Sequence, residues 1–150
     1  MRVVLQRVRE ANVTVDDATT GAIGPGLLLL AGIGPDDTTD TVRAMATRLV
    51  NIRVFEDDTG RMNRSAQEVG AELLVVSQVT LYAEIGKGRR PQFNHAAPPD
   101  RAAALITAFT AALRELGFTV AEGRFGAHMV VALVNDGPVT LVLEEPPPVV

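Results

Sequence analysis

The stretch Glu72-Leu73-Leu74-Val75-Val76-Ser77-Gln78-Val79-Thr80 is the part of this sequence that most directly predicts the fold. Its run of consecutive apolar residues, bounded by polar ones, is typical of a buried strand. The strand is expected to end in the polar cluster Ser77 to Thr80. Hydroxyl and amide side chains at the end of a buried strand are one way to build a polar site at the rim of a core.

The sequence before this stretch predicts further strands and a helix. Alternating apolar residues predict strands over residues 2–8 and 12–16, joined by a short polar turn, and an apolar run predicts a buried strand over residues 27–32. Between residues 39 and 50, apolar side chains recur at helical spacing, which predicts a helix that packs one face on the sheet. Residues 51–56 alternate again and lead into a turn rich in Asp and Gly.

The sequence after the stretch predicts one more helix and three more strands. Pro98-Pro99-Asp100 is expected to open the helix, and Gly117 is expected to end it. Strands are predicted over residues 118–121, 129–134 and 139–143, and the Asn-Asp-Gly-Pro between the last two runs is typical of a hairpin. The added proline, which cannot donate to a ladder, also makes a bulge plausible there.

The order of these elements indicates an α+β domain with a mostly antiparallel sheet and two helices. A chain of 150 residues is expected to form one domain, here residues 1–144. Residues 145–150 contain three consecutive prolines, which cannot donate hydrogen bonds to a sheet, and are expected to form a frayed tail.

The composition excludes several kinds of chemistry. The chain has no cysteine and only two histidines, so it cannot supply disulfides, thiolate nucleophiles or zinc–thiolate sites, and no metal site is expected. The acidic run Glu56-Asp57-Asp58 is interpreted as turn residues rather than a cation site. The longest uninterrupted apolar stretch, Leu27 to Ala31, is far too short for a membrane span, and no signal peptide is recognisable, so a cytoplasmic protein is expected.

The polar cluster Ser77 to Thr80 admits two interpretations. In the first, its side chains only satisfy neighbouring backbone groups at the end of a strand. In the second, it is a substrate-binding corner in which Thr80 or Ser77 is a nucleophile or an orienting group and main-chain N–H groups form an oxyanion hole. His95 could then be the general base of a hydroxyl-nucleophile esterase, although non-catalytic roles are the simpler interpretation of His95 and His128.

Positive charge is concentrated in one place on a chain with a formal net charge of −4. Lys87, Arg89 and Arg90 lie in an irregular segment of a length at which loops are often functional, and aromatic residues that could stack a base flank it. A local phosphate-binding loop and an ordinary solvated loop both fit this pattern. The first also allows a different class of protein, a tRNA- or nucleotide-binding module without catalysis.

Several motifs taken together closely resemble those of the bacterial D-aminoacyl-tRNA deacylases. The resemblance covers residues 1 to about 144, and it departs from the family pattern at Gln92, where a serine is usual. Two separated motifs in the expected order make it specific. The segments that carry it are Gln6-Arg7-Val8, Phe55-Glu56-Asp57 with Met62-Asn63, Ser77-Gln78-Val79-Thr80-Leu81-Tyr82, Lys87-Gly88 with Arg90-Pro91 and Phe93, Gly123-Arg124-Phe125-Gly126-Ala127, and Leu133-Val134-Asn135-Asp136-Gly137-Pro138-Val139-Thr140.

The resemblance implies a hydrolase that cleaves the ester bond of D-aminoacyl-tRNA, and of mischarged glycyl-tRNA, and so releases the free amino acid and tRNA during translation quality control. It implies a homodimer of small, β-barrel-like subunits that needs no cofactor. Its partner would be the 3′ end of aminoacylated tRNA, held by Lys87, Arg89 and Arg90, and not DNA or a membrane.

The same resemblance implies how the substrate is selected. Gly137 and Pro138 would form a Gly-cis-Pro element that one subunit inserts into the site of the other. Rigid backbone placed where an L side chain projects rejects L-amino acids, whereas a D side chain points outward and glycine passes. Arg7 would hold this element in place, and Phe93 would contact the substrate.

The resemblance also implies how the reaction is catalysed. The catalytic group would consist of Ser77, Gln78, Val79 and Thr80. Main-chain N–H groups around Val79 and Thr80 would stabilise the tetrahedral oxyanion, and the 2′-hydroxyl of the RNA would help the attacking water. Thr80 would therefore position the substrate rather than attack it.

Overall fold

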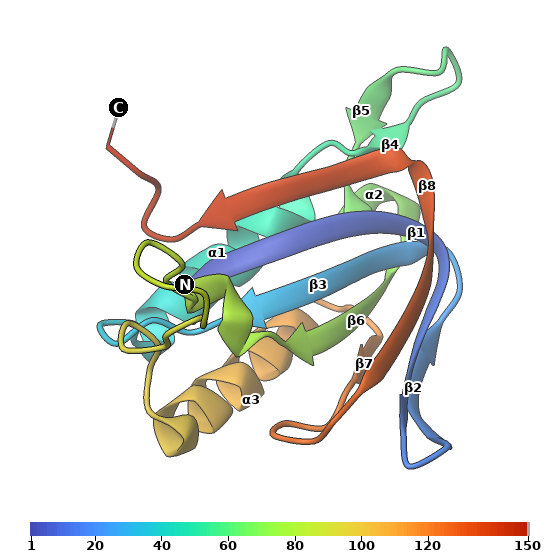
Figure 1. Ribbon diagram of the computed structural model, residues 1–150. Coiled ribbons are helices and arrows are strands. Elements are labelled where there is room, and N and C mark those ends of the chain that lie inside the picture. Colours follow the sequence, from blue (N-terminus) through green and yellow to red (C-terminus); the bar gives the residue numbers. More distant parts are fainter. Residues whose placement is uncertain (150) are drawn as a thin grey trace.

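The computed structural model of the chain describes residues 1–149, which form a six-stranded sheet with two long helices on one face (Figure 1). The strands of this sheet are β1 (Arg2–Val15), β2 (Ala18–Ile23), β3 (Gly26–Gly32), β6 (Glu72–Ser77), β7 (Val120–Glu122) and β8 (Val130–Glu144). A separate hairpin pairs β4 (Phe55–Glu56) with β5 (Met62–Arg64). The helices are α1 (Thr39–Asn51), α2 (Ala66–Val69), α3 (Pro99–Glu115) and the 3₁₀ helix η1 (Val79–Tyr82).

The predicted α+β class is confirmed, with two corrections to its details. Residues 1–149 contain three α-helices rather than two, because α2 has only four residues and is too short to show a helical repeat in the sequence. A capping box formed by Ser65 and Glu68 begins α2 and is the sequence signal that could have found it. The sheet is mixed, because β1 pairs antiparallel with its neighbours whereas β6 pairs parallel with β3 and β7.

β1 is one continuous strand, so the expected pair of strands joined by a turn is wrong. Val3 and Leu5 face the helices, whereas Ala11 and Val13 belong to the cluster on the opposite face. Residues of the same parity therefore change faces, and the register between β1 and β8 shifts over Gln6–Glu10. An irregular residue in a strand reverses the faces of all that follow. The break in alternation is thus a bulge and not a turn.

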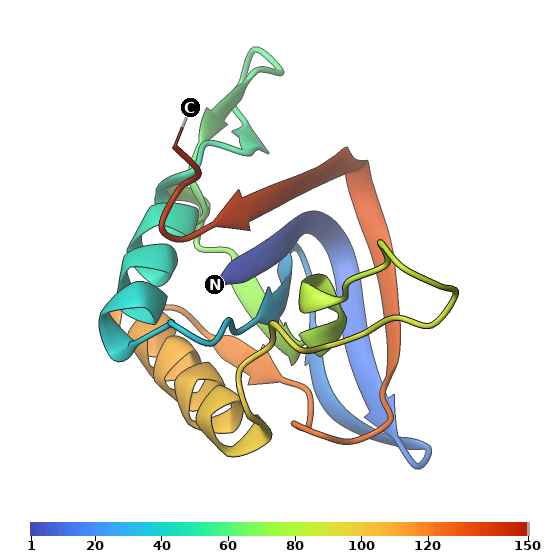
Figure 2. The ribbon, with the colours of Figure 1, turned by 60° about the vertical axis from the view of Figure 1, so that its left-hand side comes forward.

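β8 is likewise one strand, and the hairpin expected at residues 135–138 is wrong. Residues 130–135 and residues 140–144 both pair antiparallel with β1 and run in the same direction. A hairpin would have sent the second run back along the first. The Asn-Asp-Gly-Pro segment instead lies where β8 bends sharply across the sheet (Figures 1 and 2).

The bend consists of residues 136–139, which we call the corner bulge. A single β1 residue, Arg7, lies between the partners of Asn135 and Thr140, so four residues of β8 face one residue of β1. The side chain of Asn135 closes the bulge, because its Oδ1 accepts the N–H of Val139 at 2.8 Å and its Nδ2 donates to the carbonyl of Val139 at 3.1 Å. The bulge that the proline made plausible is therefore present.

The curved sheet has an apolar cluster on each face. The larger cluster lies between the sheet and helices α1 and α3, which lie together on one side of it (Figure 2). The smaller cluster fills the concave side, where β2 approaches β7 so closely that a Cβ on Gly21 would lie 2.5 Å from the carbonyl oxygen of Glu122. The sheet is therefore nearly closed.

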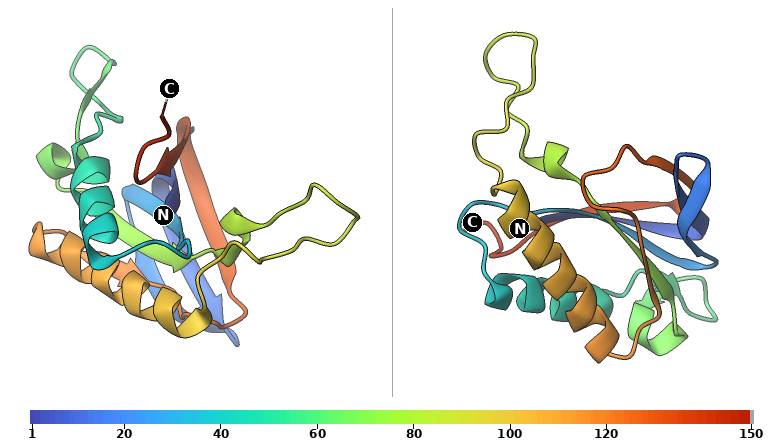
Figure 3. Two further views of the ribbon diagram at one scale, coloured as in Figure 1. Left: turned by 90° about the vertical axis from the view of Figure 1, so that its left-hand side faces the viewer. Right: turned by 90° about the horizontal axis from the view of Figure 1, so that it is seen from below.

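Two further features affect the site. The segment between η1 and α3 projects away from the sheet and the helices (Figure 3). In the part of the chain that the structure describes, no helix is long and apolar enough to span a membrane. Glu145, the first residue of the predicted tail, donates its N–H to the carbonyl of Met1 at 2.9 Å, and Val150 lies outside the described residues.

Candidate active site

The polar cluster after β6 forms a turn and a short helix rather than the end of a strand. β6 ends at Ser77, and the N–H of Gln78 donates to the carbonyl of Ala31 at 2.7 Å, so the chain leaves the sheet there. The next four residues, from Val79, form η1. Ser77 is half-buried, whereas Val79 and Thr80 are exposed. The local fold therefore presents the start of η1 at the rim of the sheet.

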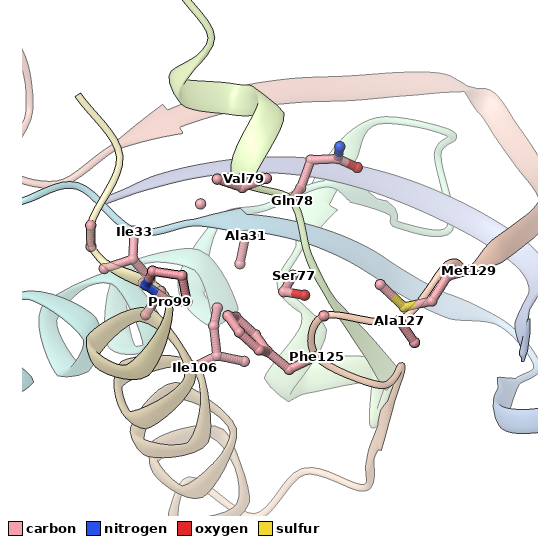
Figure 4. Close-up of a pocket in the computed structure, with 14 residues that line it drawn as sticks. Ala31, Ile33, Ser77, Gln78, Val79, Pro99, Ile106, Phe125, Ala127 and Met129 are labelled. Carbon is pink, nitrogen blue, oxygen red and sulfur yellow. The ribbon is translucent and has the colours of Figure 1, made fainter. Parts of the chain in front are cut away.

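A cavity of about 340 Å³ opens beside this turn (Figure 4). Its walls come from the ends of β3 and β6, the beginning of α3 and the loop after β7, and they are mostly apolar. In Figure 4 the side chain of Ser77 points toward the loop that carries Phe125, whereas the amide of Gln78 points away. Ile106 and Met129 line other parts of the wall. The volume is that of a small-molecule site.

Two backbone donors at the beginning of η1 have no partner. Within residues 1–149, neither the N–H of Val79 nor the N–H of Thr80 makes a hydrogen bond, and Gln78 supplies no side-chain cap to the helix. Unpaired N–H groups at a helix start attract negative charge. Because Val79 and Ser77 line the cavity, an oxygen bound at this rim that gains negative charge would find donors already in place.

The hydroxyl groups of the cluster lack a base. The hydroxyl of Thr80 is hydrogen-bonded to the amide of Gln78. The imidazole of His95, the proposed base, is paired instead with the carboxylate of Glu84 in the projecting segment. Among the described residues no histidine contacts Thr80 or Ser77. The arrangement gives no support to a hydroxyl nucleophile activated by His95.

The corner bulge is held by Arg7, whose side chain is buried although it carries a charge. Its Nε donates to the carbonyl of Asp136 at 2.8 Å, its Nη1 donates to the carbonyl of Val54 at 2.6 Å, and its Nη2 lies 3.8 Å from a carboxylate oxygen of Glu56. A guanidinium has enough donors to tie all three groups together. The peptide bond between Gly137 and Pro138 is cis.

The corner bulge is far from the cavity of its own chain. Along β1 it is level with Arg7, whereas Ser77 is level with Val3 through its β3 partner Ala31. Three strand spacings also separate β8 from β6. With a rise of about 3.3 Å per residue and a spacing of about 4.8 Å between strands, the separation is about 20 Å. A single chain therefore does not bring Gly137 to Ser77.

The projecting segment carries the cations that the sequence singled out. Lys87, Arg89 and Arg90 are exposed and take part in none of the ion pairs found in residues 1–149. Backbone hydrogen bonds of 2.8 and 3.0 Å between Glu84 and Gln92 fix the base of the segment. Phe93 is exposed next to that base, outside the cavity lining.

The acidic run near β4 has a structural role. The carboxylate of Asp57 accepts hydrogen bonds from the hydroxyl and N–H of Thr59, at 2.7 and 2.8 Å, and from the N–H of Arg61 at 3.1 Å. These donors lower the pKa of Asp57 to about 2. No cluster of three or more potential metal ligands occurs in the described part of the chain. Asp57 thus acts as a turn residue of the β4–β5 hairpin.

Sequence reasoning placed Ser77, Val79 and Thr80 at the site but gave no role to the opposite wall of the cavity. Phe125 and Met129 form that wall, and they come from a segment that is distant in sequence and has no periodic pattern. The motif Gly123-Arg124-Phe125-Gly126-Ala127 was the available signal for it.

Comparisons with known proteins agree with this site. Residues 4–144 match the family described as D-Tyr-tRNA(Tyr) deacylase. D-aminoacyl-tRNA deacylases of Heliobacterium modesticaldum and Deinococcus radiodurans are 54% and 53% identical over 144 residues, which is 96% of this chain and 96% and 99% of theirs. The solved structure of a c-Myc DNA unwinding element binding protein matches with a TM-score of 0.90 at 39% identity, covering 96% of this chain and 98% of that one. A probable eukaryotic D-amino acid tRNA deacylase shares the fold, with a TM-score of 0.82 at 21% identity over 95% and 97% of the two chains.

Proposed function

This chain belongs to the D-Tyr-tRNA(Tyr) deacylase family, and on that premise we propose that it hydrolyses D-aminoacyl-tRNA and mischarged glycyl-tRNA while sparing L-aminoacyl-tRNA. Members of the family are hydrolases of the aminoacyl-tRNA ester bond. The observation that carries the proposal for this chain is the pair of unpartnered N–H groups of Val79 and Thr80 beside an apolar cavity.

The cavity suits the terminal adenosine of tRNA. Its volume of about 340 Å³ lies in the range of nucleoside-sized sites, and Phe125 offers a ring against which a base can stack. The apolar side chain of Met129 adds a soft surface on the same wall. With the adenine there, the ribose and its aminoacyl ester would extend toward Ser77 and the start of η1.

The reaction then needs few side chains. A water molecule attacks the ester carbonyl, the carbonyl oxygen becomes an oxyanion, and the N–H groups of Val79 and Thr80 donate to it. The bond to the ribose oxygen breaks, and that oxygen leaves with a proton. The adjacent 2′-hydroxyl of the RNA is placed to assist the water, which explains why no histidine contacts Thr80. Ser77, Gln78 and Thr80 would then position the ester.

Selection of the D-amino acid would require a second subunit. The corner bulge lies about 20 Å from the cavity of its own chain by strand geometry, so Gly137 and Pro138 can reach a site only in a partner. The outer face of β8 exposes Val130, Val134 and Val142, an apolar surface that a homodimer would cover. In such a dimer the corner bulge, held rigid by Arg7, would occupy the space that an L side chain needs.

The projecting segment would grip the tRNA through its phosphates. Lys87 is the only lysine in the sequence, and Arg89 and Arg90 lie close to it. Phe93 at the base of the segment would contact the substrate near its 3′ end. On a chain with net charge −4, this local patch favours contact with the 3′ end over contact along the whole RNA.

We expect replacement of Lys87, Arg89 and Arg90 by glutamine to raise KM for D-Tyr-tRNA by about tenfold and to leave kcat within about threefold, because phosphate contacts contribute to binding rather than to chemistry. The plot of log(kcat/KM) against log[salt] should also become shallower by about two to three. The matched control, replacement of the exposed Arg43, Arg53 and Arg61 on other elements, removes the same charge. An equal effect in the control would show that net charge acts rather than this segment.

The direct test of the proposed function is to incubate the protein with D-Tyr-tRNA, L-Tyr-tRNA and Gly-tRNA and to follow the loss of the ester. We expect the D-Tyr and Gly esters to be hydrolysed at least about 10²-fold faster than the L-Tyr ester, since a steric clash with rigid backbone discriminates strongly. Equal rates for the two Tyr esters would indicate an esterase without chiral selection. Binding of tRNA without hydrolysis would indicate a binding module.

A further inference from the structure

η1 cannot hold its own geometry. It has four residues, and short 3₁₀ segments have poor hydrogen-bond geometry and depend on tertiary contacts. Val79 and Thr80 are exposed at its beginning, whereas Leu81 and Tyr82 at its end are partly buried. The contacts that fix η1 are therefore at the end away from the unpartnered N–H groups.

One side chain from β1 makes most of these contacts. The Nη1 atom of Arg2 donates to the carbonyl of Leu81 at 2.9 Å, and its guanidinium lies over the ring of Tyr82, 4.6 Å from the ring centre. Its Nε lies 3.2 Å from a carboxylate oxygen of Glu144 at the end of β8. A cation at the C-terminal carbonyls of a helix is favourable, and stacking on an aromatic face fixes the guanidinium plane.

The surface beneath η1 has room for it only because glycines lie there. A Cβ on Gly32 would lie 3.0 Å from the carbonyl oxygen of Gln78 and 3.1 Å from Cβ of Leu81. A Cβ on Gly34 would lie 2.9 Å from the hydroxyl oxygen of Tyr82. η1 is thus packed closely on the chain after β3 and is covered on its other end by Arg2.

We propose that Arg2 is a positioning residue that holds η1, through the carbonyl of Leu81 and the ring of Tyr82, so that the N–H groups of Val79 and Thr80 stay aligned for the oxyanion. The proposal rests on the proposed function. Arg2 does not line the cavity and has no direct part in the chemistry. Its effect follows from the sensitivity of an oxyanion site to small displacements of its donors.

The kinetic test uses three variants of the full-length protein. We expect Arg2→Ala to lower kcat for D-Tyr-tRNA about tenfold with KM changed less than about threefold, because binding of the adenosine and of the tRNA is untouched. Arg2→Lys, which keeps the charge without the planar fork, should restore part of the loss. Glu144→Gln removes only the ion pair and is the matched control, with kcat within about twofold of the starting protein.

A second measurement separates positioning from stability and does not depend on activity. Tyr82 is the only tyrosine and the chain has no tryptophan, so fluorescence quenching by acrylamide reports on η1 alone. We expect Arg2→Ala to increase quenching of Tyr82 and to speed amide exchange at Val79 and Thr80, with the melting temperature nearly unchanged. A protein with no deacylase activity would contradict the proposed function, and these two signals would still show whether Arg2 holds η1. Unchanged quenching and exchange, or a lower melting temperature with unchanged kcat, would overturn the proposal.

Discussion

Replacing Val79 by proline is expected to lower kcat for D-aminoacyl-tRNA hydrolysis by about 10² to 10³, the usual effect of losing one oxyanion donor. The substitution deletes a single N–H that makes no hydrogen bond within residues 1–149. Val79 is the first residue of η1, a position that proline tolerates well. Gln78 before it has φ −137° and ψ 79°, outside the helical region that a following proline disfavours. The fold should therefore survive.

The matched control is Val79→Ala, which shortens the same side chain and keeps the N–H. That side chain is 54% exposed, so little packing is lost in either variant. Single-turnover rates with D-Tyr-tRNA measure the chemical step, and the melting temperature checks the fold. We expect Val79→Ala to remain within about threefold of the starting protein. If Val79→Pro were as active as Val79→Ala, the N–H of Val79 would have no part in oxyanion stabilisation.

The elements that the sequence predicts well are those whose faces repeat without interruption. β3, β6, α1 and α3 each bury a regular set of side chains, and their positions agree with the runs and spacings seen in the sequence. β1 and β8 were divided in two because a bulge reverses their faces in mid-strand. Local patterns show the interruption, but only the pairing partner shows whether the chain turns back or continues.

The candidate site was predictable to the same extent. The polar end of β6 pointed to Ser77 and Thr80, and the resemblance to the family pointed to the N–H groups beside them. The cavity was not predictable, because Phe125 reaches Ser77 only through the tertiary fold. The same holds for Arg2, whose role depends on a carbonyl 79 residues away, a contact that no spacing in the sequence encodes.

The corner bulge and the cavity are expected to work only across two subunits, and mixed dimers can show this. Gly137→Ala should inactivate the corner bulge, because Gly137 has φ +150° and an added Cβ would lie 2.7 Å from both Cγ2 and the N atom of Val139. Val79→Pro should inactivate the cavity end of the site. Each variant alone is expected to retain less than about 1% of kcat. Arg7→Lys, which keeps the charge and loses the fork, is a second corner variant if Gly137→Ala fails to fold.

Co-expression of the two variants should then restore activity that neither has alone. In a symmetric dimer each site combines the cavity of one subunit with the corner bulge of the other. A mixed dimer of Gly137→Ala and Val79→Pro has one site with both defects and one site with neither. Random pairing makes half of the dimers mixed, so the recovered kcat should be about one quarter of the starting value. Native mass spectrometry would confirm the mixed dimers, and tagging the variants differently allows them to be purified. Mixed dimers without activity would mean that the corner bulge does not complete a partner's site, and a fully active monomer on sedimentation would mean the same.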